Sequence, residues 1–85
     1  METRVAVMSI LVENGDMVRE LNEMLHIYGE YIIGRMGIPY RKRNVNIICI
    51  ALDAPQDVIS ALSGKIGNLP GVHTKTVYSN LKSEE

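Results

Sequence analysis

Basic side chains gather beside glycine and proline in the segment GRMGIPYRKRN, residues 34–44. Guanidinium groups bind carboxylates and phosphates, so Arg35 and Arg41 are candidate ligands for a small anion. The glycine spacing matches neither a Walker-type loop nor a dinucleotide fingerprint. A solvated hairpin tip, whose charges discourage edge-to-edge aggregation, explains the same residues. We favour the hairpin tip and keep anion binding as the alternative.

A second candidate site is the loop VENGDM, residues 12–17, where an apolar run gives way to a helical pattern. Backbone amides at the start of a helix attract anions, so Asn14, Gly15 and Asp16 are candidate contacts for a small anionic effector. A capped turn explains the same residues, because Asn and Asp side chains accept hydrogen bonds from these amides. Both interpretations stay open.

Histidine, cysteine and acidic residues are too dispersed to indicate a metal centre or an active site. His26 is expected near the end of a helix, where an imidazole is favourably placed against the helix dipole, and it joins the candidate ligand-binding residues. Neither His26 nor His73 has a cysteine or a second histidine nearby at ligand spacing. No nucleophile stands beside a base. We therefore expect no metal, no cofactor and no enzymatic activity.

Two amphipathic helices and four strands are needed to position these residues. The hydrophobic pattern predicts strands over residues 4–12, 31–40, 45–52 and 72–78. It predicts one helix over residues 16–28 and a second that starts at Asp53-Ala54-Pro55 and ends at the sequence NLPG. Runs 4–12 and 45–52 are almost continuously apolar, as in central strands, whereas Gly, Pro, Lys and Thr mark the other two as edges.

The order of these elements predicts an α+β fold, a ferredoxin-like βαββαβ sandwich. Its four-stranded antiparallel sheet has the order 4-1-3-2, with both helices on one face. We expect a single domain over residues 1–79 and a loosely held tail over residues 80–85.

Both predicted central strands carry apolar side chains on both faces. One helix layer covers only one face of a sheet, so the other would expose an apolar patch that is typical of an interaction site. We therefore predict a homo-oligomer, either a dimer or a tetramer. The sequence does not tell which face is covered, so the candidate interface residues come from both: Val5, Val7, Met8, Ile10, Ile47, Ile48 and Ile50.

Composition excludes several classes of partner. The chain has 85 residues and a net charge of -1, so it has no overall attraction to nucleic acid or to an anionic membrane. Runs 4–12 and 45–52 lack the aromatic side chains on which related sheets stack RNA bases. No apolar run reaches the roughly 20 residues that cross a bilayer, and no secretory signal is recognisable. With a single cysteine, the chain is expected in the reducing cytoplasm.

Three segments, RVAVMSILVEN, LNEMLHIYGEYIIGRMGIPYRKRNVNIICIALD and ISALSGKIGNLPGV, resemble the family of iron-only hydrogenase system regulators. The resemblance covers nearly all of residues 3–78, and YGEYIIGRMGIPY is its most specific part. That family is similar in fold to ACT-type regulatory domains and to the C-terminal domain of the nickel-responsive repressor, which assemble through their sheets. The resemblance implies a non-enzymatic oligomeric regulatory domain, binding a small effector or a protein partner. A structural assembly subunit with no small-molecule ligand is the alternative.

The resemblance to the nickel sensor does not carry its metal site. His26 falls on one nickel-ligand position, but the other three fall on Gly37, Pro39 and Val45, whose side chains cannot coordinate nickel. Whether His26 takes part in a metal site between subunits stays open. The first loop, residues 13–16, also lacks the proline-glycine signature that is common in ACT domains.

Overall fold

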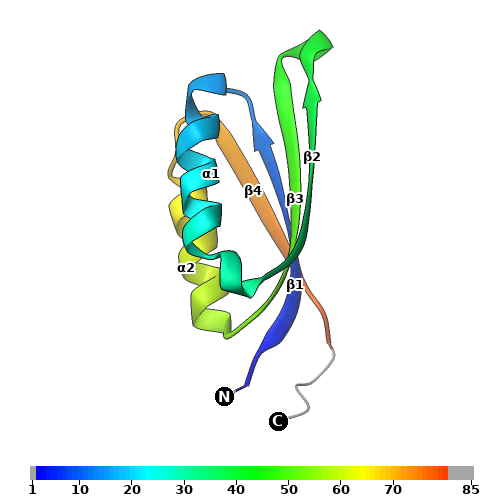
Figure 1. Cartoon of the computed structure of the whole chain (residues 1–85), viewed down its shortest axis with the longest axis vertical. Coiled ribbons are helices and arrows are strands. Elements are labelled where there is room, and N and C mark those ends of the chain that lie inside the picture. Colours follow the sequence, from blue (N-terminus) through cyan, green and yellow to red (C-terminus); the bar gives the residue numbers. More distant parts are fainter. Residues whose placement is uncertain (1, 81–85) are drawn as a thin grey trace.

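The computed structural model describes residues 2–80, which form one sheet covered on one face by two helices (Figure 1). The elements are β1 (Arg4–Val12), α1 (Val18–Ile27), β2 (Ile32–Tyr40), β3 (Val45–Ala54), α2 (Gln56–Gly67) and β4 (Val72–Tyr78). Short 3-10 turns, η1 (Gly15–Met17), η2 (Gly29–Tyr31) and η3 (Arg41–Arg43), flank α1 and join β2 to β3. All strand pairs are antiparallel and the order is β2-β3-β1-β4. The predicted ferredoxin-like fold and strand order are confirmed.

The boundary between β3 and α2 differs from the prediction. Asp53 and Ala54 belong to the strand, because they pair with Val5 and Arg4 and extend the β1–β3 ladder to the start of β1. Pro55 has the extended conformation (φ −58°, ψ 146°) and precedes the first helical residue, Gln56. Proline therefore stands at the N-cap of α2 and not inside its first turn.

The core lies between the helices and alternate residues of the central strands. β1 buries Ala6, Met8, Ile10 and Val12, and β3 buries Ile48, Ile50, Leu52 and Ala54. The helices contribute the apolar stripes that their spacing predicts, which include the buried residues Leu21, Leu25, Ile59, Leu62 and Ile66.

This arrangement corrects the predicted interface. Met8, Ile10, Ile48 and Ile50 lie beneath the helices and do not reach the uncovered face. Burial alternates along a strand, so the covered face takes the even-numbered residues of β1 and β3. Of the seven candidates, Val5, Val7 and Ile47 remain on the uncovered side. Their role in an interface stays a prediction.

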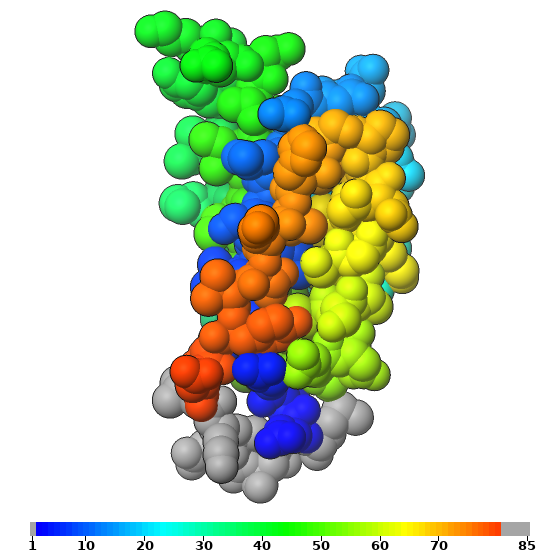
Figure 2. Space-filling view, turned by 180° about the vertical axis from the view of Figure 1, so that it is seen from behind, coloured from blue at the N-terminus to red at the C-terminus, as the bar shows by residue number. Residues whose placement is uncertain are grey.

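The β2–β3 hairpin projects beyond the helices as an arm (Figure 1), and the space-filling view shows its green end standing clear of α2 (Figure 2). Every residue of β2 except Ile32 is exposed, including those that face the helix side of the sheet. At the tip, Asn44 adopts the left-handed conformation (φ 55°, ψ 44°), and its amide donates to the carbonyl oxygen of Arg41 at 3.1 Å. The tip is thus a tight turn, as predicted.

At the opposite end of the sheet, the two outer ends of the described chain are joined. The amide of Ser79 donates to the carbonyl oxygen of Val5 at 2.8 Å. The Arg4 guanidinium lies 4.5 Å from the centroid of the Tyr78 ring and donates to Oε1 of Gln56 at 2.9 Å. These contacts tie β1 to β4 and to the start of α2.

Candidate interaction surface and ligand groove

The sheet face turned away from the helices, called the open face below, carries the alternate residues of every strand. Its members are Val5, Val7, Ser9 and Leu11 of β1, Gly34, Met36, Ile38 and Tyr40 of β2, Val45, Ile47, Cys49, Ala51 and Asp53 of β3, and His73, Lys75 and Val77 of β4. Among the described residues, the exposed large hydrophobic side chains outside it are Ile27 and Ile33. The open face is therefore an extended apolar surface that the described chain leaves uncovered.

The register of the strands arranges this surface in rows. One row joins Val77, Val7, Ala51 and Gly34, and the row nearest the arm tip joins His73, Leu11, Ile47 and Ile38. Between them lies a row of Lys75, Ser9, Cys49 and Met36. Bulky side chains thus concentrate toward the arm and small ones toward the other end.

A hollow of about 500 Å³ opens at the arm end of the open face. It is lined by Leu11, Glu13, Tyr40, Arg43, Asn44, Val45 and Ile47. One side of its rim is fixed by the exposed pair of Glu13 and His73, whose Oε1 and Nε2 atoms lie 2.9 Å apart. The other side carries Arg43, so an apolar floor is bordered by one acidic and one basic side chain.

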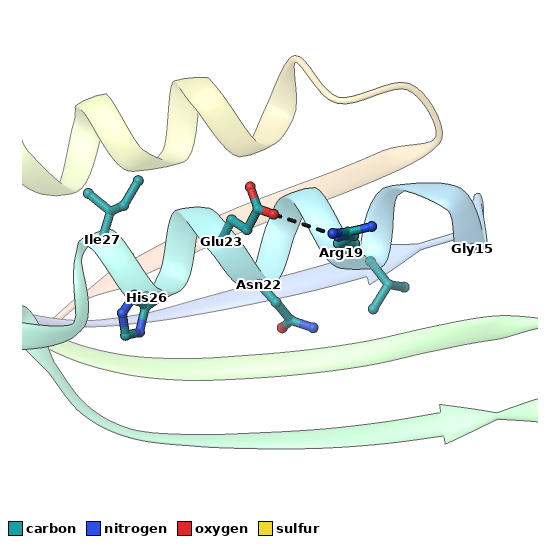
Figure 3. A pocket seen from close by; sticks show the side chains of 7 residues that line it. Gly15, Arg19, Asn22, Glu23, His26 and Ile27 are labelled. Atoms are coloured by element: carbon teal, nitrogen blue, oxygen red, sulfur yellow. Dashed lines mark ion pairs between the residues drawn. The ribbon is translucent and has the colours of Figure 1, made fainter.

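A second hollow, the α1 groove, lies on the outer side of α1 and has a volume of about 820 Å³. It is lined by Gly15, Val18, Arg19, Asn22, Glu23, His26 and Ile27. Figure 3 shows Asn22 and His26 projecting from α1 toward the β2 and β3 ribbons, whereas Glu23 projects on the opposite side toward Arg19. The Arg19 Nε and Glu23 Oε1 atoms are 3.8 Å apart. From β2, Nη2 of Arg35 donates to Oδ1 of Asn22 at 2.9 Å.

The structure brings together only part of the predicted ligand set. Gly15 and His26 line the α1 groove, and Arg35 reaches it through Asn22. Arg41 lies apart, at the arm tip, six residues along the chain from Arg35 and therefore about 20 Å away. Sequence reasoning missed Asn22, which had no signal of its own because its partner depends on how β2 packs beside α1.

The first loop forms the capped turn that was one of its two interpretations. Oδ1 of Asn14 accepts a hydrogen bond from the amide of Asp16 at 3.0 Å, so this side chain serves the start of η1. The amide of Glu13 donates to the carbonyl oxygen of Gly71 at 2.8 Å, which ties the loop to the turn before β4. Ligand binding by Asn14, Gly15 or Asp16 stays a prediction.

Within residues 2–80, no group of three or more His, Cys, Asp or Glu side chains is placed to hold a metal ion. Cys49 is a free, half-buried thiol in the middle row of the open face. No helix in this part of the chain is long and apolar enough to cross a membrane.

Residues 4–76 match the model of the TM1266-like family, described as iron-only hydrogenase system regulators. The chain belongs to this family. It is similar to the structure titled as that of uncharacterized protein TM1266 from Thermotoga maritima, with 40% sequence identity and a TM-score of 0.86 over 89% of this chain and 96% of that chain. No curated protein gave a significant match. The family resemblance that the sequence suggested is confirmed.

Proposed function

We propose that this protein is a cytoplasmic, non-enzymatic regulatory module of an iron-only hydrogenase system, which self-associates through the open face and binds a small effector or a protein partner. The regulatory part of this proposal rests on the family, whose description is that of hydrogenase system regulators. The oligomeric part rests on one observation, the extended apolar surface that faces away from the helices.

The size of the open face supports self-association. Nine-residue strands at about 3.3 Å per residue, in a four-strand sheet with about 4.8 Å between strands, give a footprint of roughly 600 Å². Two such footprints total roughly 1,200 Å², which is the lower end of stable protein interfaces. Exposed apolar side chains on this face, among them Met36 and Val77, would leave water on association.

Association is tested with two matched substitutions. Met36 is 59% exposed on the open face and Ile27 is 74% exposed at the end of α1, so a charge at either site should leave the fold intact. We expect the wild-type chain and Ile27→Glu to sediment as oligomers at micromolar concentration, and Met36→Glu to dissociate. A monomeric wild-type chain, or an oligomer that survives Met36→Glu, would contradict association through the open face.

The α1 groove supports the effector part of the proposal. Arg35, bonded to Asn22 of the lining, offers a positive charge, and the His26 ring offers polar nitrogen atoms beside the apolar side chains of Val18 and Ile27. Such a lining suits a small molecule with a carboxylate or phosphate group and an apolar part. Asn22 holds the Arg35 guanidinium in place, which reduces the rotamer entropy lost on binding.

The alternative, an assembly subunit with no small-molecule ligand, predicts a different response in thermal denaturation. A ligand that binds the native state stabilises it and so raises the melting temperature. At a ligand concentration of one hundred times its Kd, the stabilisation is about 2.7 kcal/mol. Amino acids, nucleotides, inorganic phosphate and divalent metals are the panel to measure. A shift lost in Arg35→Ala supports effector binding at the α1 groove, whereas no shift across the panel favours the assembly role.

A further inference from the structure

The size of the side chains on the open face changes along the strands, and this change indicates how a second copy would lie on the face. Toward the arm, Leu11, Ile47 and Ile38 form a row of branched side chains. Two rows away, the same three strands carry Val7, Ala51 and Gly34, and each of these residues is smaller than the one on its strand in the arm row. Close packing of two sheets requires large side chains of one to fill the space left by small ones of the other.

Oppositely charged side chains also stand at the two ends of the open face; Glu13, at the arm end, is paired with His73. Arg43 borders the hollow at the arm end. Asp53 lies exposed at the other end of β3, on the open face beside Val5. Val45 and Asp53 are eight residues apart on one extended strand, so these ends are separated by about 26 Å. Arg43 and Asp53 of one chain therefore cannot contact each other.

We infer that two copies pack open face to open face with their strands antiparallel, about a two-fold axis that crosses the strands near the row of Cys49. This arrangement deepens the proposed self-association and rests on it. The row of Leu11 and Ile47 of one copy then lies over the row of Val7 and Ala51 of the other. Each Arg43 meets Asp53 of the second copy, and the two-fold axis repeats this contact.

The alternative axis, running along the strands, fits these residues worse. It would place the bulky row over the bulky row and leave the small rows facing each other across a gap. It would also bring Arg43 toward Arg43 and Asp53 toward Asp53, and like charges in an interface oppose association. Side-chain size and the pair of Arg43 and Asp53 therefore favour the antiparallel orientation. The axis near Cys49 also sets Lys75 of the two copies opposite each other, but Lys75 is exposed on the edge strand β4, where its side chain can extend into solvent.

The first test is a charge exchange measured by sedimentation equilibrium of the full chain. Arg43→Asp and Asp53→Arg should each weaken the dimer Kd about 10- to 30-fold, since each reversal makes two contacts repulsive. The double variant should return to within about threefold of wild type. Because the two residues are remote within one chain, rescue reports contact between copies.

A matched pair controls for the change of charge itself. Lys42 neighbours Arg43 at the arm tip, and Asp57 lies in the first turn of α2, on the helix side of the sheet. Lys42→Asp combined with Asp57→Arg alters the same charges, and we expect no rescue in this double variant. Rescue in the control, or none with Arg43 and Asp53, overturns the antiparallel arrangement.

The second test measures orientation directly. A spin label at Lys42→Cys, in a Cys49→Ser background, marks the two arm tips. The antiparallel arrangement places these labels at opposite ends, roughly 40 Å apart, whereas the alternative axis places them side by side at about 10 to 20 Å. A short distance between labels overturns the arrangement and leaves self-association standing. A monomer at micromolar concentration overturns both.

Discussion

Gly71 holds the turn before β4 in a conformation and a space that only glycine satisfies. Its φ is +71°, in the left-handed region, which costs other residues about 1–2 kcal/mol. A Cβ atom at this position would lie 2.8 Å from Cβ of Asn14 and 3.3 Å from its amide nitrogen. Asn14 would have to move, although its side chain caps η1 and its neighbour Glu13 donates to the Gly71 carbonyl.

We predict that Gly71→Ala lowers the free energy of unfolding by about 1.5 to 5 kcal/mol. The estimate adds the backbone term of about 1–2 kcal/mol to the loss of one or two hydrogen bonds at about 0.5–1.5 kcal/mol each. In a domain of this size, about 1 kcal/mol corresponds to a shift of about 4–8 °C in melting temperature, so the melting temperature should fall by at least about 6 °C. Circular dichroism during heating, at one fixed protein concentration, measures it.

Two further variants separate the contributions. Gly64→Ala is the control, because a Cβ there meets nothing within 4 Å and alanine favours the helix by about 1 kcal/mol, so stability should rise. Gly71→Asn tolerates the left-handed conformation better but keeps the steric contact, so its loss should be smaller than that of Gly71→Ala without vanishing. A melting temperature of Gly71→Ala within about 2 °C of wild type would refute this reasoning.

Three more changes are to be measured by urea denaturation at fixed protein concentration. Met8→Ala removes a fully buried side chain at 0% exposure and should cost about 2–5 kcal/mol; a loss below about 1 kcal/mol would argue against the core assignment. Asn14→Ala removes the cap on the amide of Asp16 and should cost about 1 kcal/mol, and an unchanged midpoint would mean that solvent replaces the cap. Thr76→Val should raise stability by about 1 kcal/mol, because Oγ1 of Thr76 is buried and has no hydrogen-bond partner among residues 2–80; a decrease would argue that this hydroxyl does have a partner.

The strand order was predictable from the sequence because composition differs between central and edge strands. β1 and β3 are predominantly apolar, whereas β2 carries Gly34, Gly37 and Pro39 and β4 carries lysine and threonine. Helix positions were likewise predictable, since Leu21, Leu25, Ile59, Leu62 and Ile66 recur at helical spacing and all are buried. These signals are local, so they do not depend on how the elements pack against one another.

The choice of covered face was not predictable, because the two sets of side chains in β1 and β3 are similarly apolar. In the sequence, Val5 and Val7 are as apolar as Met8 and Ile10, and only the position of the helices shows which pair is buried. The hydrogen bond between Arg35 and Asn22 was not predictable for a different reason. The register shifts between Ile32 and Gly34, and such an irregularity decides which face each later residue of β2 occupies. A period-two pattern does not reveal the irregularity beforehand.

The expected loose tail, residues 80–85, falls outside the described residues except for Asn80. The separation of the described chain into a compact body and an arm was also absent from the sequence pattern. Strands of nine and ten residues form the arm, whereas the helices reach only part of their length (Figure 1). Helix length and strand length are set by separate local signals, so their mismatch emerges only in three dimensions.

The hydrogen bond between Ser79 and Val5 has a practical consequence for rearranging the chain. Residues this close can be bridged by a short flexible linker, and a new start can be cut into the turn of Arg41, Lys42 and Arg43, which is exposed and lies far from the core. Such a circular permutant would keep the whole hydrophobic interior while converting β2 and β3 from a closed hairpin into two terminal segments.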